Sequence, residues 1–230
     1  VLIYGLANTA RRAREWQRAG YGTQLMTGIA WGSYQDYLYG RFDGKNHEDE
    51  AQHDRHGKPI SHGGDVYYMV PTASYADYLC AFISRSFDLP LDGICLEEPE
   101  FWMRAGWSPA FRREWEEHYG EPWQAPDSSH AACWRAGVLK KELYRRCLDT
   151  VCGFVKRHKP DWECIVATHS LINYANWGIA SPESALATIA ACDTIIAQVW
   201  TDTILTACTY DGLTRSRPFA NAYLEFAQMD

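Results

Sequence analysis

The stretch GICLEEPEFW, residues 93–102, joins an apolar run to a dense group of carboxylates and aromatic rings. Its first part, Ile94, Cys95 and Leu96, has the length and character of a buried β-strand. Two glutamates follow directly, and then Pro99, which lacks a backbone N–H and disfavours continuation of a strand or helix. The stretch therefore predicts a strand that ends in carboxylates on a rigid support.

Similar short apolar runs recur along the chain and alternate with segments of helical periodicity, which is typical of βαβ units around a parallel sheet. The predicted strands cover residues 1–6, 23–28, 93–96, 164–168, 194–200 and 220–224. Residues 66–70 are expected to belong to a long loop instead.

The segments between the predicted strands carry helix start and stop signals. Thr72 can cap one helix, and Ser108 with Pro109 begins a second one that Gly120 ends. Ser181 and Pro182 repeat the second type of start, and a long helix is expected over residues 131–159.

The composition limits the possible functions. The chain has 230 residues, 47% of them hydrophobic, so we expect one domain over residues 1–230. A net charge of -7 and scattered basic residues argue against nucleic-acid binding. Because no run of about 18 apolar residues exists, no membrane-spanning segment is expected. Ten Trp and 14 Tyr suit surfaces that bind sugars.

Most of the eight cysteines lie inside apolar runs or helical patterns. We expect buried free thiols in a reducing, cytoplasmic compartment at Cys80, Cys95, Cys147, Cys152, Cys164 and Cys192. The first residue, Val1, opens directly into a predicted strand, so we expect the true N-terminus and any signal peptide to be missing.

Six strands with crossover helices fit either an open doubly wound sheet or a barrel. The nucleotide-binding version of the open sheet is disfavoured, because no GxGxxG or GxxxxGK[ST] follows a predicted strand. We therefore predict an α/β fold of the (β/α)8 TIM-barrel type, incomplete because its first strand and its C-terminal end are missing.

Carboxylates follow two of the predicted strands, where barrels of this type place their catalytic groups. Glu97 and Glu98 follow residues 93–96, and Glu225 follows residues 220–224. Strand side chains alternate, so at most one of the two adjacent glutamates points straight into the barrel mouth. Two carboxylates across the mouth are what glycoside hydrolysis requires.

A simpler interpretation remains open. Glu97, Glu98 and Glu100 could merely favour the N-terminal end of the next helix, with Glu225 on the surface.

The strands of the predicted barrel can be numbered in two ways. If one strand is lost before Val1, the Glu98 strand is the fourth and the Glu225 strand the seventh. If none is lost, residues 66–70 must supply a strand.

The segment Glu97-Glu98-Pro99 resembles the Asn-Glu-Pro motif at the end of the fourth strand in clan A glycoside hydrolases. These are retaining (β/α)8 enzymes that include beta-galactosidase-like families, and their nucleophile is a Glu at the end of the seventh strand. The aromatic run over residues 101–123 also resembles their strand-to-helix segments.

This resemblance implies hydrolysis of a beta-linked glycoside, with Glu98 as acid/base and Glu225 as nucleophile. The chain departs from the motif at Glu97, which stands in the place of Asn. The hydrogen bond that the Asn makes to the substrate 2-hydroxyl would here involve a carboxyl group.

Polar and aromatic side chains near the ends of predicted strands are candidates for substrate binding. These are Glu97, Glu100, Trp102, His169, Asn173, Tyr174, Gln198 and Trp200. The expected partner is an oligosaccharide or glycoside, and no cofactor or metal is expected.

Residues 31–62 are rich in histidine and carboxylate, and we expect them to form a substrate-binding loop over the barrel mouth. Their spacing matches no established metal-binding pattern. Two alternative functions stay open: a non-catalytic carbohydrate-binding barrel, and a metal-dependent hydrolase that uses this histidine-rich loop.

Overall fold

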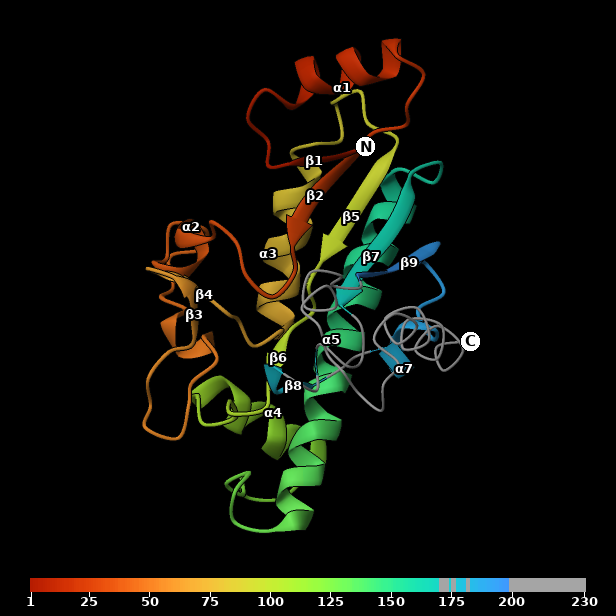
Figure 1. Ribbon diagram of the computed structural model, residues 1–230. Coiled ribbons are helices and arrows are strands. Elements are labelled where there is room, and N and C mark those ends of the chain that lie inside the picture. Colours follow the sequence, from red (N-terminus) through yellow and green to blue (C-terminus); the bar gives the residue numbers. More distant parts are fainter. Residues whose placement is uncertain (170–173, 175–176, 181–182, 199–230) are drawn as a thin grey trace, which may run out of the picture.

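A five-stranded parallel sheet forms the centre of the chain (Figure 1). The structure is a computed structural model that describes residues 1–169, 174, 177–180 and 183–198. The strands are β1 (Leu2–Tyr4), β2 (Gln24–Gly28), β5 (Gly93–Glu97), β7 (Glu163–His169) and β9 (Thr194–Gln198). Five of the predicted strands are thus confirmed, and the sixth, residues 220–224, lies outside the described residues.

The strand order distinguishes the two folds that the sequence left open. The order is β1-β2-β5-β7-β9. The strands of this sheet therefore follow one another in space in the same order as in the sequence. All four pairs are parallel. A doubly wound sheet would reverse its order at a switch point, whereas a barrel winds in one direction, as this sheet does.

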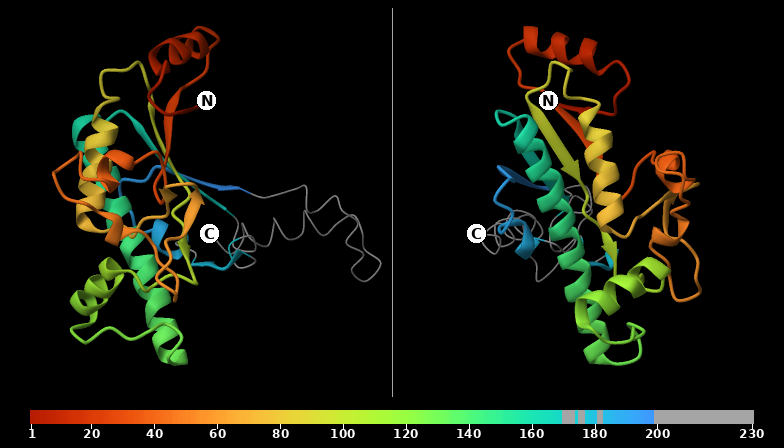
Figure 2. Two further views of the ribbon diagram at one scale, coloured as in Figure 1. Left: turned by 90° about the vertical axis from the view of Figure 1, so that its left-hand side faces the viewer. Right: turned by 180° about the vertical axis from the view of Figure 1, so that it is seen from behind.

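Helices connect the strands of the sheet. They are α1 (Thr9–Arg18), α3 (Ala73–Ser84), α4 (Pro109–Tyr119), α5 (His130–His158) and the short α7 (Glu183–Leu186). Helices α3 and α5 lie on the same side of the sheet (Figure 2). This one-sided arrangement is the one in which helices surround a barrel.

The predicted helix starts are confirmed where the structure describes them. Thr72 Oγ1 accepts a hydrogen bond from the Tyr75 N–H at 3.1 Å, and Ser108 Oγ accepts one from the Phe111 N–H at 3.3 Å. Gly120 ends α4 with a φ of 65°, the left-handed conformation that glycine adopts without steric cost. Ser181 and Pro182 lie outside the described residues.

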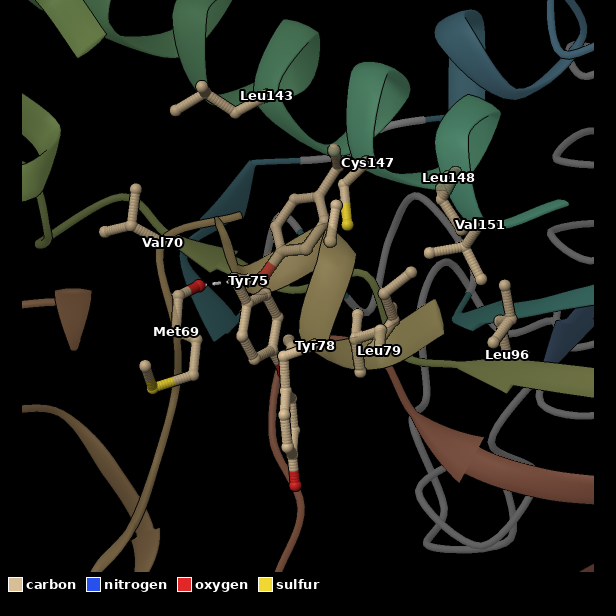
Figure 3. Packing of buried hydrophobic residues seen from close by; sticks show 14 of the residues in the cluster. Met69, Val70, Tyr75, Tyr78, Leu79, Leu96, Leu143, Cys147, Leu148 and Val151 are labelled. Carbon is tan, nitrogen blue, oxygen red and sulfur yellow. Dashed lines mark hydrogen bonds between the residues drawn. The ribbon is translucent and has the colours of Figure 1, made fainter. Parts of the chain in front are cut away.

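The two faces of the sheet carry different clusters of apolar side chains. Leu96 points toward the helices and packs in the large core with Leu79 of α3 and Val151 of α5 (Figure 3). Cys95 points the other way and packs in a small cluster with Met26. Because α3 and α5 cover the first face, we interpret the second as the inner face of the barrel.

The cysteine prediction is largely confirmed. Cys80, Cys95, Cys147, Cys152 and Cys164 are free and buried, whereas Cys192 is free but only half-buried. Among the helices that the structure describes, none is long and apolar enough to span a bilayer.

A long excursion separates β2 from α3. It contains α2 (Gln35–Leu38), the 3-10 helix η1 (Glu48–Glu50) and the antiparallel pair β3 (Ser61–Gly63) and β4 (Val66–Tyr67). The suggestion that residues 66–70 supply a strand of the main sheet is therefore wrong, because β4 pairs only with β3.

A second short excursion follows β5. Strand β6 (Phe101–Trp102) pairs antiparallel with β8 (Ile179–Ala180), and α4 begins only at Pro109. Glu97, Glu98 and Glu100 therefore do not lie at the N-terminus of a following helix. The interpretation based on the helix dipole is wrong, because β6 and a loop intervene.

Candidate active site

Three neighbouring strand ends meet at Glu98. This residue directly follows β5, His169 is the last residue of β7, and Trp31 comes shortly after β2. His169 Nε2 lies 2.9 Å from Glu98 Oε1, and Trp31 Nε1–H donates to Glu98 Oε2 at 2.7 Å. Both carboxylate oxygens of Glu98 are thus held by side chains from the adjacent strands.

Glu98 also has an unusual backbone conformation. Its φ is 54°, in the left-handed region that a residue with a side chain occupies at a cost of roughly 1–3 kcal/mol. Its N–H donates to the carbonyl oxygen of Ala167 at 2.8 Å, and its own carbonyl accepts from the Glu100 N–H at 2.7 Å. The surrounding contacts therefore hold a strained residue, which is a common feature of functional sites.

Glu100 approaches the same histidine from a buried position. Its Oε1 lies 3.9 Å from His169 Nε2, and the residue is only 4% exposed. Donor atoms of Glu98, Glu100 and His169 all lie within 4.8 Å of one another, close enough for a metal ion. The 2.9 Å contact between His169 and Glu98 has hydrogen-bond length, whereas Glu100 lies beyond hydrogen-bond distance from His169.

Glu97 lies on the inner face of the barrel. It follows Cys95 by two residues in β5, and its register partners on β2 and β7 are Gly28 and Ala167. A Cβ atom at Gly28 would clash with the carbonyl oxygen of Trp31, so Trp31 fills the space beside Glu97 on the β2 side. Among the described residues Glu97 Oε2 is buried without a hydrogen-bond partner.

The three carboxyl groups have different electrostatics. Burial and the charge of Glu98 raise the pKa of Glu97 to about 7 and the pKa of Glu100 to about 8. For Glu98 burial also acts to raise the pKa, but hydrogen bonds from His169 and Trp31 outweigh it and lower the pKa below its usual value. Glu98 is therefore the ionised carboxylate of the group at neutral pH.

An aromatic wall stands beside these carboxylates. We use this name for Trp31, His62, Tyr68 and Trp102. The Trp31 and His62 rings stack with centroids 3.8 Å apart, and His62 Nδ1 lies 3.1 Å from the Tyr68 hydroxyl. The Tyr68 ring in turn meets Trp102 edge-on at 5.6 Å. The long excursion after β2 thus brings aromatic side chains to Glu98.

The histidine-rich loop does not form a metal site of its own. In the described part of the chain, its ligand-type residues do not gather as a group of three within metal-binding distance. Instead, the buried Glu50 accepts hydrogen bonds from Tyr37, Thr72 and Ser74 at 2.6–2.8 Å, and His47 Nδ1 lies 3.2 Å away. These contacts fix the shape of the loop, and the alternative of a metal-dependent hydrolase that uses this loop stays a prediction.

Buried side chains also hold the backbone that follows the carboxylates. Gln52 is fully buried, donates to the Glu100 carbonyl at 2.9 Å and accepts from the Trp102 N–H at 3.0 Å. The Tyr144 hydroxyl donates to the same Glu100 carbonyl at 3.0 Å. Lys140 Nζ donates to the carbonyls of Trp102 and Met103. These bonds fix the backbone of residues 100–103 in place.

The remaining candidates from the sequence lie in different situations. Tyr174 is fully buried, and its ring packs edge-on against the His169 ring with centroids 5.6 Å apart. Gln198 is the last residue of β9, where its backbone is in register with His169. Asn173, Trp200 and Glu225 lie outside the described residues.

Sequence reasoning predicted that residues 31–62 form a loop over the barrel mouth, but it did not single out Trp31, His62 or Tyr68 as neighbours of the carboxylates. Trp31 comes shortly after the predicted strand at residues 23–28. The rule that barrels place functional groups directly after their strands, which indicated Glu98, could therefore also have indicated Trp31. His62 and Tyr68 carried no such signal, because their places depend on how the long excursion folds back.

No protein-family model matches the sequence, and the comparison with curated proteins finds no match either. Among solved structures, the chain is similar to a beta-galactosidase from the Antarctic haloarchaeon Halorubrum lacusprofundi, with a TM-score of 0.58 at 13% identity over 92% of this chain. It is also similar to a beta-galactosidase from Bacillus circulans sp. alkalophilus, with a TM-score of 0.58 at 11% identity over 95% of this chain. A third similar structure is a cold-adapted beta-galactosidase from Rahnella sp. R3, with a TM-score of 0.55 at 9% identity over 86% of this chain.

The chain spans only about a third of these proteins, 37%, 34% and 34% of their lengths respectively. At such low identity the likeness shows the fold alone. Together with the one-directional strand order, it shows that the described sheet has the fold of part of a TIM-type barrel.

Proposed function

We propose that this chain carries the catalytic carboxylates of a glycoside hydrolase that cleaves a beta-linked glycoside. The main observation is the gathering of Glu97, Glu98 and Glu100 around His169 at the carboxyl edge of the barrel sheet. This edge is where barrel enzymes place their catalysis. Because the similar solved structures are named beta-galactosidases, beta-galactosides are the first substrates to test.

The two catalytic carboxylates in this proposal are Glu98 and Glu225. In a retaining mechanism, a carboxylic acid protonates the departing oxygen while a carboxylate attacks the anomeric carbon. Water then releases the sugar from the covalent intermediate. Glu225, which the resemblance implies as the nucleophile, lies outside the described residues, so its place opposite Glu98 stays a prediction.

The aromatic wall gives the proposed substrate a surface to bind. Sugar rings present an apolar face and a rim of hydroxyl groups, which match aromatic rings that carry polar tips. Among the described residues Trp102 Nε1 is buried without a hydrogen-bond partner, and the Trp31 N–H is already bonded to Glu98. We propose that Trp102 and the edge of the wall contact the sugar, alongside Glu97, Glu100 and His169.

The test measures release of the aryl alcohol from an aryl beta-galactoside by the intact chain and by two variants. Glu98→Gln and Glu225→Gln are each expected to lower kcat by about 10²-fold or more, since each removes a catalytic carboxylate. Glu117→Gln, on the exposed side of α4, serves as the matched control. Circular dichroism of each variant verifies the fold.

Two results would argue against this function. Full activity in both active-site variants would remove the carboxylates from the mechanism. If calorimetry shows that the unmodified chain binds galactosides but releases no product, a non-catalytic carbohydrate-binding barrel is the better interpretation.

A further inference from the structure

The left-handed backbone of Glu98 persists only if its neighbours hold it, because an ordinary backbone conformation would be more favourable. On the N-terminal side, the Glu98 N–H is bound to the carbonyl oxygen of Ala167 in β7. On the C-terminal side, Pro99 fixes its own φ and disfavours a helical conformation at Glu98. The conformation of Glu98 therefore depends on what fixes the chain after Pro99.

The side-chain amide of Gln52 fixes that part of the chain. Its Nε2 donates to the Glu100 carbonyl at 2.9 Å, and its Oε1 accepts from the Trp102 backbone N–H at 3.0 Å. Glu100 is in turn bonded to Glu98, because its N–H donates to the Glu98 carbonyl at 2.7 Å. One fully buried amide thus holds the backbone on both sides of Phe101 and, through Glu100, the carbonyl of Glu98.

Gln52 is itself fixed to the long excursion. Its backbone N–H donates to the Tyr68 carbonyl at 2.6 Å, and its own carbonyl accepts from the Ile60 N–H at 2.8 Å. Its side-chain Nε2 also donates to the Met69 carbonyl at 3.1 Å. Because both the backbone and the side chain of Gln52 are held, it cannot simply follow a movement of Glu100.

The partners of Gln52 require an amide at this position. The carbonyls of Glu100 and Met69 need donors, whereas the Trp102 N–H needs an acceptor. The two N–H groups and one oxygen of the Gln52 amide satisfy all three, which also fixes the orientation of the amide. An ionised carboxylate would offer no donor, and an apolar side chain would leave all three buried groups without this partner.

We infer from these contacts that Gln52 is a positioning residue for Glu98: it holds the chain after Pro99, so that the Glu98 carboxylate stays between His169 and Trp31. The inference deepens the proposed function and rests on it for the effect on turnover. It gives the long excursion a second task, because the segment that brings the aromatic wall to Glu98 also holds the backbone of that residue.

The first experiment observes Glu98 without using activity. NMR records the indole N–H of Trp31 and the ¹³C-labelled side-chain carboxyl carbon of Glu98, both assigned by their loss in Trp31→Phe and Glu98→Gln. Gln52→Met keeps the length of the side chain and removes its hydrogen bonds. The indole signal is expected to move toward its position in Glu98→Gln, and the pKa of Glu98 should rise, because the hydrogen bonds that lower it weaken.

Thr9→Val is the matched control. Thr9 is 1% exposed, and its hydroxyl donates to the Gly5 carbonyl at 2.7 Å, so this variant also removes a buried hydrogen bond, but at the start of α1. It is expected to lower stability and to leave both NMR signals in place. If Gln52→Met also leaves them in place, the inference is overturned, because Gln52 then stabilises the fold without positioning Glu98.

Tyr144→Phe is the second variant in case Gln52→Met does not fold. The Tyr144 hydroxyl donates to the same Glu100 carbonyl at 3.0 Å, and Phe keeps the ring. Because Gln52 still binds this carbonyl, the Trp31 signal is expected to move in the same direction by a smaller amount. An unmoved Trp31 signal in this variant would likewise count against the inference.

The second experiment measures turnover of an aryl beta-galactoside. Gln52→Met is expected to lower kcat by about 10–10²-fold and to change KM by less than about threefold, because a misplaced carboxylate affects the transition state more than the bound substrate. Thr9→Val should keep the kcat of the unmodified chain. A loss in Gln52→Met that falls on KM alone would overturn the positioning role.

The outcomes separate this inference from the proposed function. If the unmodified chain hydrolyses no glycoside but the Glu98 and Trp31 signals move in Gln52→Met, the proposed function is wrong and Gln52 still positions Glu98. If the chain hydrolyses glycosides and these signals do not move, only the inference is wrong.

Discussion

His169 Nε2 lies 2.9 Å from Glu98 Oε1, which joins the end of β7 to the residue that follows β5. This contact depends on the parallel register, in which Glu97 is level with Ala167. The same side-chain pair influences the chemistry, because a hydrogen bond from His169 is among the causes that lower the pKa of Glu98. The ionisation of the candidate active site is therefore set by a neighbouring strand.

The Trp31 indole is expected to lower the pKa of Glu98 through its hydrogen bond. Trp31→Phe keeps a ring that can pack on His62 but removes the N–H donated to Glu98 Oε2. Loss of a hydrogen bond to a charged group, worth about 1.5–3 kcal/mol, should raise the pKa of Glu98 by about one unit or more. The limb of the kcat/KM profile that reports the ionisation of Glu98 is expected to move to higher pH by that amount. Trp16→Phe, at an exposed indole on α1, is the control, and an unmoved limb would contradict the prediction.

Glu100 is expected to make stability depend on pH. Its pKa is raised to about 8, mainly by burial, so between about pH 4.3 and pH 8 the folded chain binds more protons than the unfolded chain. The free energy of unfolding should therefore fall as pH rises through this window. Glu100→Gln should flatten this slope, because an amide does not titrate. Urea unfolding at about pH 5 and about pH 8.5 measures it, and an unchanged slope in the variant would refute the assignment.

Lys140 is expected to make the free energy of unfolding rise with pH, opposite to the effect of Glu100. It is 1% exposed, and burial lowers the pKa of its ammonium group to about 7. Between pH 7 and the ordinary value of about 10.4, the unfolded chain binds more protons, so stability should rise with pH. Lys140→Met removes this rise and leaves the carbonyls of Trp102 and Met103 without their donor. Unfolding free energies of both proteins from about pH 7.5 to pH 10 test the prediction, and parallel curves would disprove it.

Glu50 is expected to be the main polar anchor of the long excursion. Its two oxygens accept from three hydroxyl groups, including those of Tyr37 and Thr72. Glu50→Gln places an amide NH₂ against donors and should cost about 2–4 kcal/mol of unfolding free energy, because buried donors lose their acceptor. The exposed Glu48→Gln is the control for chemical denaturation. A loss below about 0.5 kcal/mol, the size of an ordinary surface effect, would show that the excursion is held elsewhere.

The sequence determined the secondary structure where local signals were strong. Thr72 and Ser108 cap helices as their positions predicted, and the run before Glu97 forms a strand, because capping groups and apolar periodicity act within a few residues. The placement of carboxylates after β5 could be predicted for the same reason. The alternation rule predicted that Glu97 and Glu98 point to different sides, but the sequence did not say which of the two faces the inside of the barrel.

Only the tertiary structure decided which side chains meet those carboxylates. Trp31 and His169 come from other strands, and His62 comes from a hairpin whose path depends on long-range contacts such as those of Glu50. No local pattern encodes these distances. The sequence by itself therefore determined that carboxylates end a buried strand. The fold decided which of them is ionised, because burial and hydrogen bonds between distant residues set the pKa of each group.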